Sequence, residues 1–286
     1  MLQFHEDSHF FLEALNFTEA ETSFPARLVE KDYFCTIVLA YLTQTADTLV
    51  FKGGTCLAKI HASFFRLSED LDFMIPVSDK NTRGMRRKTI AGVKDAFAAL
   101  STALPCLQVL QPLSGANNST QYMGTLGYHS LTTGQKETIK IEVSLREPLL
   151  RPAVGGEART LLINPVNGNT LVTPVIVPCM SLIEAYAEKF RAALSRLEVA
   201  IRDFYDLDYA VRNSILQIGD ADLVELIRKK LTVRGNQAID ISDDRLAGLR
   251  QQVEPQLRPV LRRGDFAEFD IERAIQLVTD MAAKIS

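Results

Sequence analysis

The stretch FKGGTCLAKIHASFFRLSEDLDF, residues 51–73, decides the fold that we expect for this chain. It begins as a short apolar strand, turns at the glycine pair Gly53–Gly54, continues as a helix and ends in a second strand that carries Asp70 and Asp72. Alternate side chains of a strand share a face, so both carboxylates should point the same way while Leu71 points into the core. A strand, a helix and a strand in this order predict a mixed α/β sheet.

Two carboxylates at one point of a sheet indicate a cation site. Like charges side by side are unfavourable, and a bound Mg²⁺ ion, which prefers carboxylate and phosphate oxygens, is a physical reason to keep them. The glycine pair lets a phosphate approach the backbone, and a helix that begins at Thr55 would direct free N–H groups toward it. The sequence therefore predicts a cleft in which a metal ion and a triphosphate meet.

The segment ETIKIEVSL, residues 137–145, offers a third acid. Its apolar residues alternate with polar ones, and Glu142 lies on the polar face. Three carboxylates on neighbouring strands can hold two metal ions about 3.5–4 Å apart, which activates an attacking hydroxyl and stabilises a pyrophosphate leaving group. The alternative interpretation is a solvated strand face on which Glu142 pairs with Lys140.

The rest of the chain predicts two domains. Helical periodicity is expected at 24–44 and 80–101, and strands follow Pro105. Near Pro174 and Pro178 the alternating pattern changes to helical periodicity that lasts to the end. We therefore expect an α/β domain over residues 1–175 and an all-helical domain over residues 176–286, with helices at 180–213, 220–232, 243–252 and 266–284.

Composition indicates a folded, water-soluble protein: 47% of the 286 residues are apolar and 23% are charged. No apolar stretch reaches the roughly 20 residues of a membrane span, and the acidic N-terminus does not resemble a signal peptide, so we expect a cytoplasmic protein without a membrane partner. The four cysteines are isolated and predict reduced core thiols. His5–His9 matches H-E-x-x-H, but it lies in an acidic terminus, and His61 and His129 lack metal-ligand spacing.

The net charge of −3 gives no global attraction for nucleic acid, so such a partner would have to be held by local basic clusters. Clusters of this kind are usually solvated helix faces. The candidate RNA-binding residues follow the second strand or lie in the helical half, and they are Arg83, Arg86, Arg87, Arg191 and Arg196. Further clusters in the helical half are Arg228–Lys230 with Arg234, and Arg258 with Arg262–Arg263.

Six segments, in this order, resemble the AbiEii / MenT family of nucleotidyltransferase toxins of type IV-like toxin–antitoxin systems. They lie within residues 24–213, and they are EKD at Glu30–Asp32, FKGGTCLAK at Phe51–Lys59, RLSEDLDF at Arg66–Phe73, IEV at Ile141–Val143, EKFRAALSR at Glu188–Arg196 and RDFYDLD at Arg202–Asp208. The resemblance implies a polymerase-β-like nucleotidyltransferase fold followed by a helical C-terminal domain.

The resemblance also implies the roles of single residues. The metal ligands would be Asp70, Asp72 and Glu142, and the triphosphate would lie against Lys52, Gly53, Gly54, Thr55 and Ser68. In the helical half, Lys189 would be a catalytic, nucleotide-binding lysine with an acid at Asp203 or Asp206. On one unbroken helix Lys189 and Asp203 lie about 40° apart and Asp206 about 100° away, so Asp203 is the better partner, whereas a kink near Ser195 would reopen the choice.

The expected function is that of a Mg²⁺-dependent toxin, with Mn²⁺ as a possible substitute, that transfers a nucleoside monophosphate from an NTP to an RNA acceptor. The resemblance favours the 3′ end of tRNA as acceptor, a block of translation as the effect and a cognate antitoxin protein as a partner. The alternatives are the same transfer to a protein or small-molecule hydroxyl, and a non-catalytic binding protein on the same scaffold.

Overall fold

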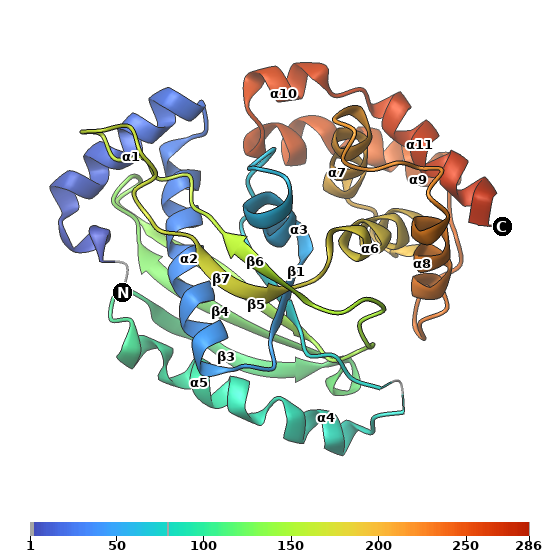
Figure 1. Ribbon diagram of the computed structural model, residues 1–286, viewed down its shortest axis with the longest axis horizontal. Helices are drawn as coiled ribbons and strands as arrows, with labels where there is room; N and C mark the ends of the chain where they lie inside the picture. Colours follow the sequence, from blue (N-terminus) through green and yellow to red (C-terminus); the bar gives the residue numbers. More distant parts are fainter. Residues whose placement is uncertain (1–2, 79, 286) are drawn as a thin grey trace. The chain divides into compact units, whose positions relative to one another are not determined.

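The computed structural model describes residues 3–78 and 80–285, which form two compact units, Met1–Met180 and Ser181–Ser286 (Figure 1). The division falls at 180/181 and not at the expected 175/176. The reason is the strand Val175–Cys179, which belongs to the sheet of the first unit. The C-terminal limit of the first unit is therefore set by strand pairing.

The first unit is built on a mixed sheet of seven described strands in the order β3-β4-β5-β2-β1-β7-β6. The pairs β2–β5 and β1–β7 are parallel, and the other neighbouring pairs are antiparallel. The predicted mixed α/β sheet is thus confirmed. The strands are β1 (Val50–Lys52), β2 (Leu71–Met74), β3 (Gln108–Ala116), β4 (Gln121–His129), β5 (Lys136–Ser144), β6 (Val154–Ala158) and β7 (Val175–Cys179).

The helices of this unit differ from the expected ones in two places. The helix expected over 80–101 is two helices that meet at Ile90, and the helix expected to begin at Thr55 begins at Gly53 and changes to a π-helical turn. The helical elements are the 3₁₀ turns Phe4–Glu6 and Asn117–Ser119, α1 (Ser8–Thr22), α2 (Ala26–Thr45), α3 (Gly53–Cys56), the π turn Leu57–His61, α4 (Arg83–Thr89) and α5 (Ala91–Ala103).

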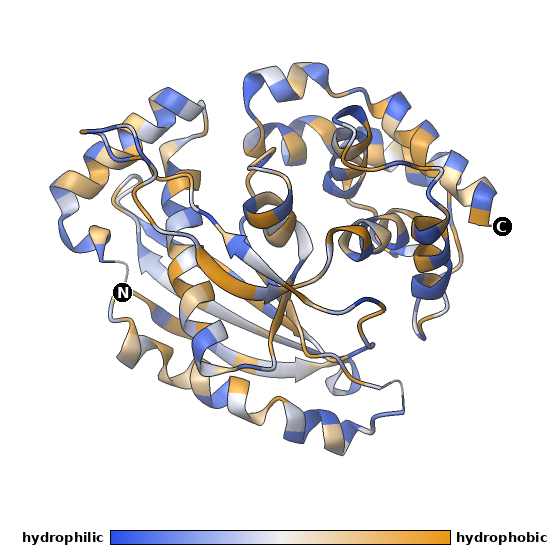
Figure 2. Cartoon of the chain, in the orientation of Figure 1, coloured by the Kyte–Doolittle hydropathy of each residue, from blue (hydrophilic) through white to orange (hydrophobic). Residues whose placement is uncertain are grey.

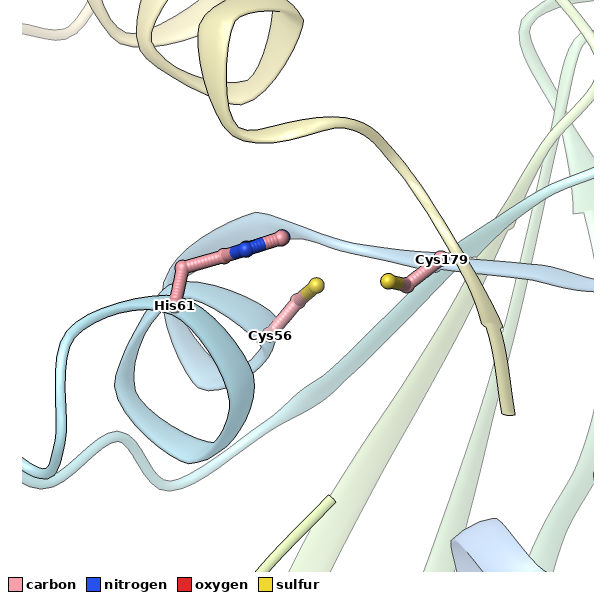
Figure 3. A group of neighbouring side chains, drawn as sticks. All are labelled: Cys56, His61 and Cys179. Atoms are coloured by element: carbon pink, nitrogen blue, oxygen red, sulfur yellow. The ribbon is translucent and has the colours of Figure 1, made fainter. Parts of the chain in front are cut away.

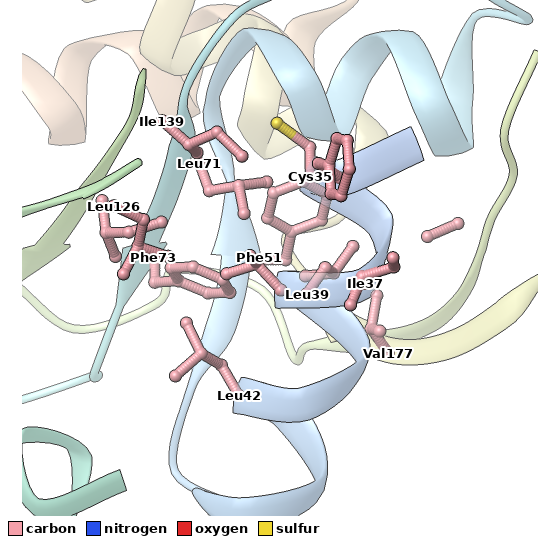
Figure 4. Close-up of a cluster of buried hydrophobic side chains, with 14 of the residues drawn as sticks. Cys35, Ile37, Leu39, Leu42, Phe51, Leu71, Phe73, Leu126, Ile139 and Val177 are labelled. Carbon is pink, nitrogen blue, oxygen red and sulfur yellow. The ribbon is translucent and has the colours of Figure 1, made fainter. Parts of the chain in front are cut away.

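The core of this unit lies between α2 and one face of the sheet (Figure 4). Leu71 and Phe73 are fully buried there, as the strand alternation predicted. Helix α2 supplies Leu39 and Leu42 to the same cluster, and apolar residues mark both α2 and β7 in Figure 2. Because the core takes up this face of β2, the carboxylates must lie on the other face.

Residues 181–285 of the second unit, as the structure describes them, form helices joined by turns and loops, with no strand. The single helix expected over 180–213 is wrong: α6 ends at Ser195, and α7 begins at Ile201. The helix expected over 266–284 is likewise divided between α10 and α11. The elements are α6 (Leu182–Ser195), α7 (Ile201–Arg212), α8 (Ala221–Leu231), α9 (Asp243–Arg250), the π turn Val253–Leu257, the 3₁₀ turn Arg258–Val260, α10 (Arg263–Glu268) and α11 (Ile271–Ile285).

The described helices also bear on membrane association. Across residues 3–78 and 80–285, none of them combines the length and the apolar character that crossing a bilayer demands.

Candidate active site

Two of the predicted acids are direct neighbours on the sheet. In the parallel pair β2–β5, Asp72 is in register with Glu142, while Leu71 and Phe73 pair with residues whose side chains are buried. Both carboxylates therefore lie on the face of the sheet that the α2 core leaves free, and both are half-buried. Lys52 of β1 lies opposite Asp72 on the other side, so a cationic residue and two acids form one row across three strands.

Asp70 lies just before β2, two residues from Asp72, and is also half-buried. Its carboxylate accepts a long hydrogen bond from the backbone N–H of Lys140 at 3.4 Å, which places Asp70 beside β5. The backbone carbonyl of Asp70 accepts a hydrogen bond from the hydroxyl of Thr55. Asp70 is thus attached both to β5 and to α3, the helix that begins at the glycine pair.

The glycine pair is required by space as well as by conformation. Gly53 has φ +77°, and a Cβ atom there would lie 2.3 Å from Oδ2 of Asp72. A Cβ atom on Gly54 would lie 2.6 Å from Nη2 of Arg66 and 3.3 Å from Oγ of Ser68. The structure therefore brings the glycine backbone directly against Asp72 and Ser68.

A buried ion pair, which was not predicted from the sequence, holds the π turn after α3 in place. Nζ of Lys59, a fully buried side chain, lies 2.6 Å from Oδ1 of Asp32 and donates to Oγ1 of Thr36 at 2.7 Å and to the carbonyl of Arg159 at 3.2 Å. Burial raises the pKa of the Asp32 carboxyl, and Lys59 beside it acts in the opposite direction. The pair connects the π turn after α3 to α2. Lys59 and Asp32 therefore fix the position of α3, which begins with Gly53 and Gly54.

Glu30 is a second buried acid of the same EKD segment. It accepts hydrogen bonds from Oγ of Ser130 at 2.6 Å, from the N–H of Leu131 at 2.7 Å and from Oγ1 of Thr132 at 2.7 Å. These bonds attach α2 to the turn between β4 and β5, and β5 carries Glu142. The signal for both structural acids was available in the sequence: charged residues stand in an otherwise apolar helix, where burial requires partners.

In the second unit, Lys189 of α6 contacts both candidate acids. Its Nζ lies 2.7 Å from Oδ1 of Asp203 and 2.8 Å from Oδ2 of Asp206. Asp206 is fully buried and Asp203 nearly so. Because the helix is interrupted between Ser195 and Ile201, α7 directs both Asp203 and Asp206 toward Lys189. No choice between the two acids is therefore needed, unlike on one unbroken helix.

The comparisons with known proteins bear on this geometry. The family model for the nucleotidyl transferase AbiEii toxin of a type IV toxin–antitoxin system matches residues 38–277. The chain belongs to the AbiEii family of nucleotidyltransferase toxins. The AbiEii match spans both units and includes Asp70, Asp72, Glu142, the glycine pair and Lys189, so this AbiEii protein is a nucleotidyltransferase.

Two solved structures are similar to this AbiEii protein at low sequence identity, and the first of them shares its fold. JHP933 from Helicobacter pylori is 16% identical, with a TM-score of 0.53 over 92% of this chain and 93% of that chain. The nucleotidyltransferase toxin MenT4 from Mycobacterium tuberculosis is 16% identical, with a TM-score of 0.49 over 100% of this chain and 99% of that chain. The comparison with curated proteins gives no match.

The candidate RNA-binding residues of this AbiEii protein fall into two groups. Arg83 and Arg87 are exposed and, with Lys94, line a cavity of about 420 Å³ beneath α4 and α5 that also contacts Tyr122. Arg86 is buried and donates to the backbone carbonyls of Asn81 and Asn118, the latter at 3.1 Å. Its guanidinium is occupied within the protein, so Arg86 is removed from the candidate surface.

The same distinction separates the basic residues of the second unit. Arg196 is exposed, whereas Arg191 is half-buried. Nη2 of Arg191 lies 3.4 Å from Oε1 of Glu188. Lys230 is fully buried and lies 2.7 Å from Glu184. The basic clusters predicted from the sequence therefore contain both exposed cations and buried cations that form ion pairs within the protein.

Proposed function

We propose that this AbiEii protein transfers a nucleoside monophosphate from an NTP to an RNA acceptor in a Mg²⁺-dependent reaction, with the 3′ end of tRNA as acceptor and a block of translation as the result. The observation that carries the proposal is the in-register pair Asp72–Glu142 beside the Gly53 backbone. Carboxylates next to a backbone that accepts no side chain suit a metal ion and a phosphate better than a solvated sheet face.

The donor set fits Mg²⁺. Asp70, Asp72 and Glu142 offer only carboxylate oxygens, the ligands that a hard cation prefers, and we assign them as the metal ligands, with Mn²⁺ as a substitute. When bound, the metal supplies charge neutralisation at the triphosphate and lowers the pKa of the attacking hydroxyl. The backbone of Gly53 lies directly against Asp72, so a phosphate bound to this backbone would lie beside the acids.

The protein's own residues bind and orient the nucleotide. The backbone of Gly53 and Gly54, the hydroxyls of Thr55 and Ser68, and the ammonium group of Lys52 are assigned to the triphosphate. In the second unit, Lys189 is assigned to a phosphate group, and Asp203 with Asp206 fixes the direction of its ammonium group.

The acceptor RNA is assigned to the exposed cations. Arg83, Arg87 and Lys94 line the cavity beneath α4 and α5, and Arg196 is exposed in the second unit. Tyr122 of that cavity is in register with Val143, whose side chain is buried, so the cavity lies on the sheet face opposite Glu142. These cations would therefore hold a part of the RNA remote from the reacting end. The cytoplasm, where tRNA is present, is the expected compartment, and a cognate antitoxin is the expected protein partner.

A transfer assay tests the proposal. The purified protein is incubated with Mg²⁺ and each labelled NTP, with total tRNA in one series and total protein in another. Label on the tRNA 3′ end that disappears with Asp72→Asn supports the proposal, whereas label on protein alone assigns the acceptor to a protein hydroxyl. No transfer to either acceptor, from a protein that binds NTP normally, would favour a non-catalytic binding protein.

A further inference from the structure

Cys56, His61 and Cys179 lie together in the first unit, away from the predicted acids. The two sulfur atoms and one ring nitrogen of His61 all lie within 4.8 Å of one another. Figure 3 shows the sulfur atoms of the two cysteines directed toward each other, with the His61 ring on the same side of the helix as Cys56. Both cysteines are fully buried, and His61 is half-buried.

Local helix geometry brings the first two residues together. Cys56 ends α3, and the following turn, Leu57–His61, is π-helical. A π turn bonds residues five apart, so His61 returns to the side of the helix on which Cys56 lies, and such turns are frequent at functional sites. The spacing C-x₄-H is not a recognised metal motif, so the sequence did not predict His61 as a metal ligand.

Strand pairing supplies the third residue. Cys179 is the last residue of β7 and is in register with Phe51 of β1, the strand that leads into the glycine pair. The neighbouring strand β6 contributes Gly156, where a Cβ atom would lie 2.7 Å from Sγ of Cys179. The glycine makes the room that the Cys179 sulfur occupies, so the sulfur has a defined place and does not merely fill a gap in the core.

The donor set is specific for soft or borderline cations. Two sulfurs and one imidazole nitrogen match the ligands of Zn²⁺, which binds sulfur at about 2.3 Å and nitrogen at about 2.0–2.1 Å. A tetrahedral site of these bond lengths keeps its ligand atoms about 3.5–3.8 Å apart, so a contraction of about 1 Å from the 4.8 Å limit is enough.

His61 has the hydrogen bond that usually supports a ligand histidine. Its Nε2 lies 3.0 Å from the carbonyl oxygen of Met180, and because a carbonyl only accepts, Nε2 carries the proton. In the tautomer with the proton on Nε2, the lone pair lies on Nδ1, the nitrogen that remains for a metal. Met180 is itself fixed, because its N–H donates to the carbonyl of Phe51 at 2.9 Å.

We propose that Cys56, His61 and Cys179 form a site for a thiophilic divalent cation, Zn²⁺ in the first place, with a water molecule as the fourth ligand on the half-exposed His61 side. The bound ion ties α3, which begins at Gly53, to β7 and so stiffens the glycine pair. This proposal is independent of the proposed function. The hard carboxylate site and this sulfur site differ in the cations they select.

Co²⁺ titration of metal-free, tag-free protein tests the site, because cobalt replaces zinc in tetrahedral sites and gives a thiolate charge-transfer band. We expect the band to saturate at one Co²⁺ per chain and to disappear when Zn²⁺ is added. Cys56→Ser and Cys179→Ser should abolish the band, and His61→Ala should weaken binding at least about tenfold. The matched controls Cys106→Ser and Asp72→Asn should keep the wild-type band.

A second measurement on the wild-type chain keeps the test valid if a cysteine variant fails to fold. Zn²⁺ should raise the Tm of metal-free wild-type protein and slow the reaction of two of its four thiols with a thiol reagent. No charge-transfer band together with no thiol protection would overturn the proposal. So would a band that survives in Cys179→Ser, and so would peroxide oxidation to a Cys56–Cys179 disulfide in a chain that binds no Zn²⁺.

Discussion

Asp72 on β2 and Glu142 on β5 are direct partners in a parallel strand pair, on the sheet face that the α2 core leaves free. Two carboxylates in register on neighbouring strands repel one another. The cation that we propose for this site would relieve the repulsion, so the stability of the pair and the chemistry of the site would depend on the same ion.

Replacing either acid of this pair should remove transfer and leave the fold intact. For Asp72→Asn and for Glu142→Gln we expect a fall in transfer rate of at least about 100-fold, because each variant loses one metal ligand. The Tm in metal-free buffer should be unchanged or slightly higher, since one charge of the repelling pair is gone. Glu157→Gln, an exposed carboxylate of β6, is the control. Wild-type transfer by Asp72→Asn would refute the metal assignment.

Gly53→Ala should lose both stability and activity, and Gly134→Ala separates the two effects. Both glycines have positive φ, +77° and +67°, so each alanine costs about 1–2 kcal/mol of backbone strain. Only at Gly53 does the new Cβ meet Asp72, at 2.3 Å, whereas nothing lies within 4 Å at Gly134. Urea unfolding should show a loss in both variants, and transfer assays should show a loss in Gly53→Ala alone. Equal activity in the two variants would contradict the contact with Asp72.

Lys189 should prove both structural and functional. Lys189→Met leaves Asp203 and Asp206 without their shared cation, and we expect a destabilisation of about 3–5 kcal/mol because these acids are almost completely buried. Adding Asp203→Asn and Asp206→Asn to Lys189→Met should recover much of that stability but no transfer. Lys189→Arg should restore kcat/KM only in part, since the guanidinium differs in shape. Recovery of transfer in the triple variant would show that Lys189 only supports the fold.

The buried Lys59–Asp32 pair predicts a pH-dependent defect. Lys59→Met should destabilise the protein by about 3–5 kcal/mol at neutral pH, because a charged Asp32 is left buried without its cation. Burial already raises the pKa of the Asp32 carboxyl in the folded state. At low pH Asp32 is protonated, and the variant keeps its stability. This stability is lost as the pH rises through the pKa that Asp32 has in the folded protein. The deficit relative to wild type should therefore shrink on acidification, as measured by urea unfolding across a pH series. Lys59→Met with Asp32→Asn should show no such dependence.

RNA binding should depend on Arg83 and Arg87 but not directly on Arg86. Arg83→Glu with Arg87→Glu should weaken tRNA binding, and each lost phosphate contact should reduce the slope of log K against log salt by roughly 0.7–0.9. NTP binding should change little. Arg250→Gln, an exposed cation paired with Glu272, is the control. Arg86→Gln should lower the Tm instead, because it removes bonds to Asn81 and Asn118. Undiminished tRNA affinity in the double variant would move the acceptor site elsewhere, with Arg196 as the next candidate.

The sequence by itself determined the parts of the site that depend on local periodicity. A period of two along 70–73 and 137–145 put Asp72 and Glu142 on the polar face of each strand, and two adjacent glycines after a strand predicted a close backbone approach. Both features involve residues within one or two strand positions of each other, so no knowledge of distant partners was needed. The mixed sheet followed by a helical unit was predictable for the same reason.

Tertiary structure alone decided which distant groups meet. Lys189 contacts both Asp203 and Asp206 because the chain is interrupted between Ser195 and Ile201, and helical phase cannot be carried across an interruption. Arg86 is buried although its neighbour Arg87 is exposed. Cys179 reaches Cys56 only through the parallel pairing of β7 with β1. A repeat in the sequence tells which face a side chain takes, whereas the partner on that face is set by packing between segments far apart in the chain.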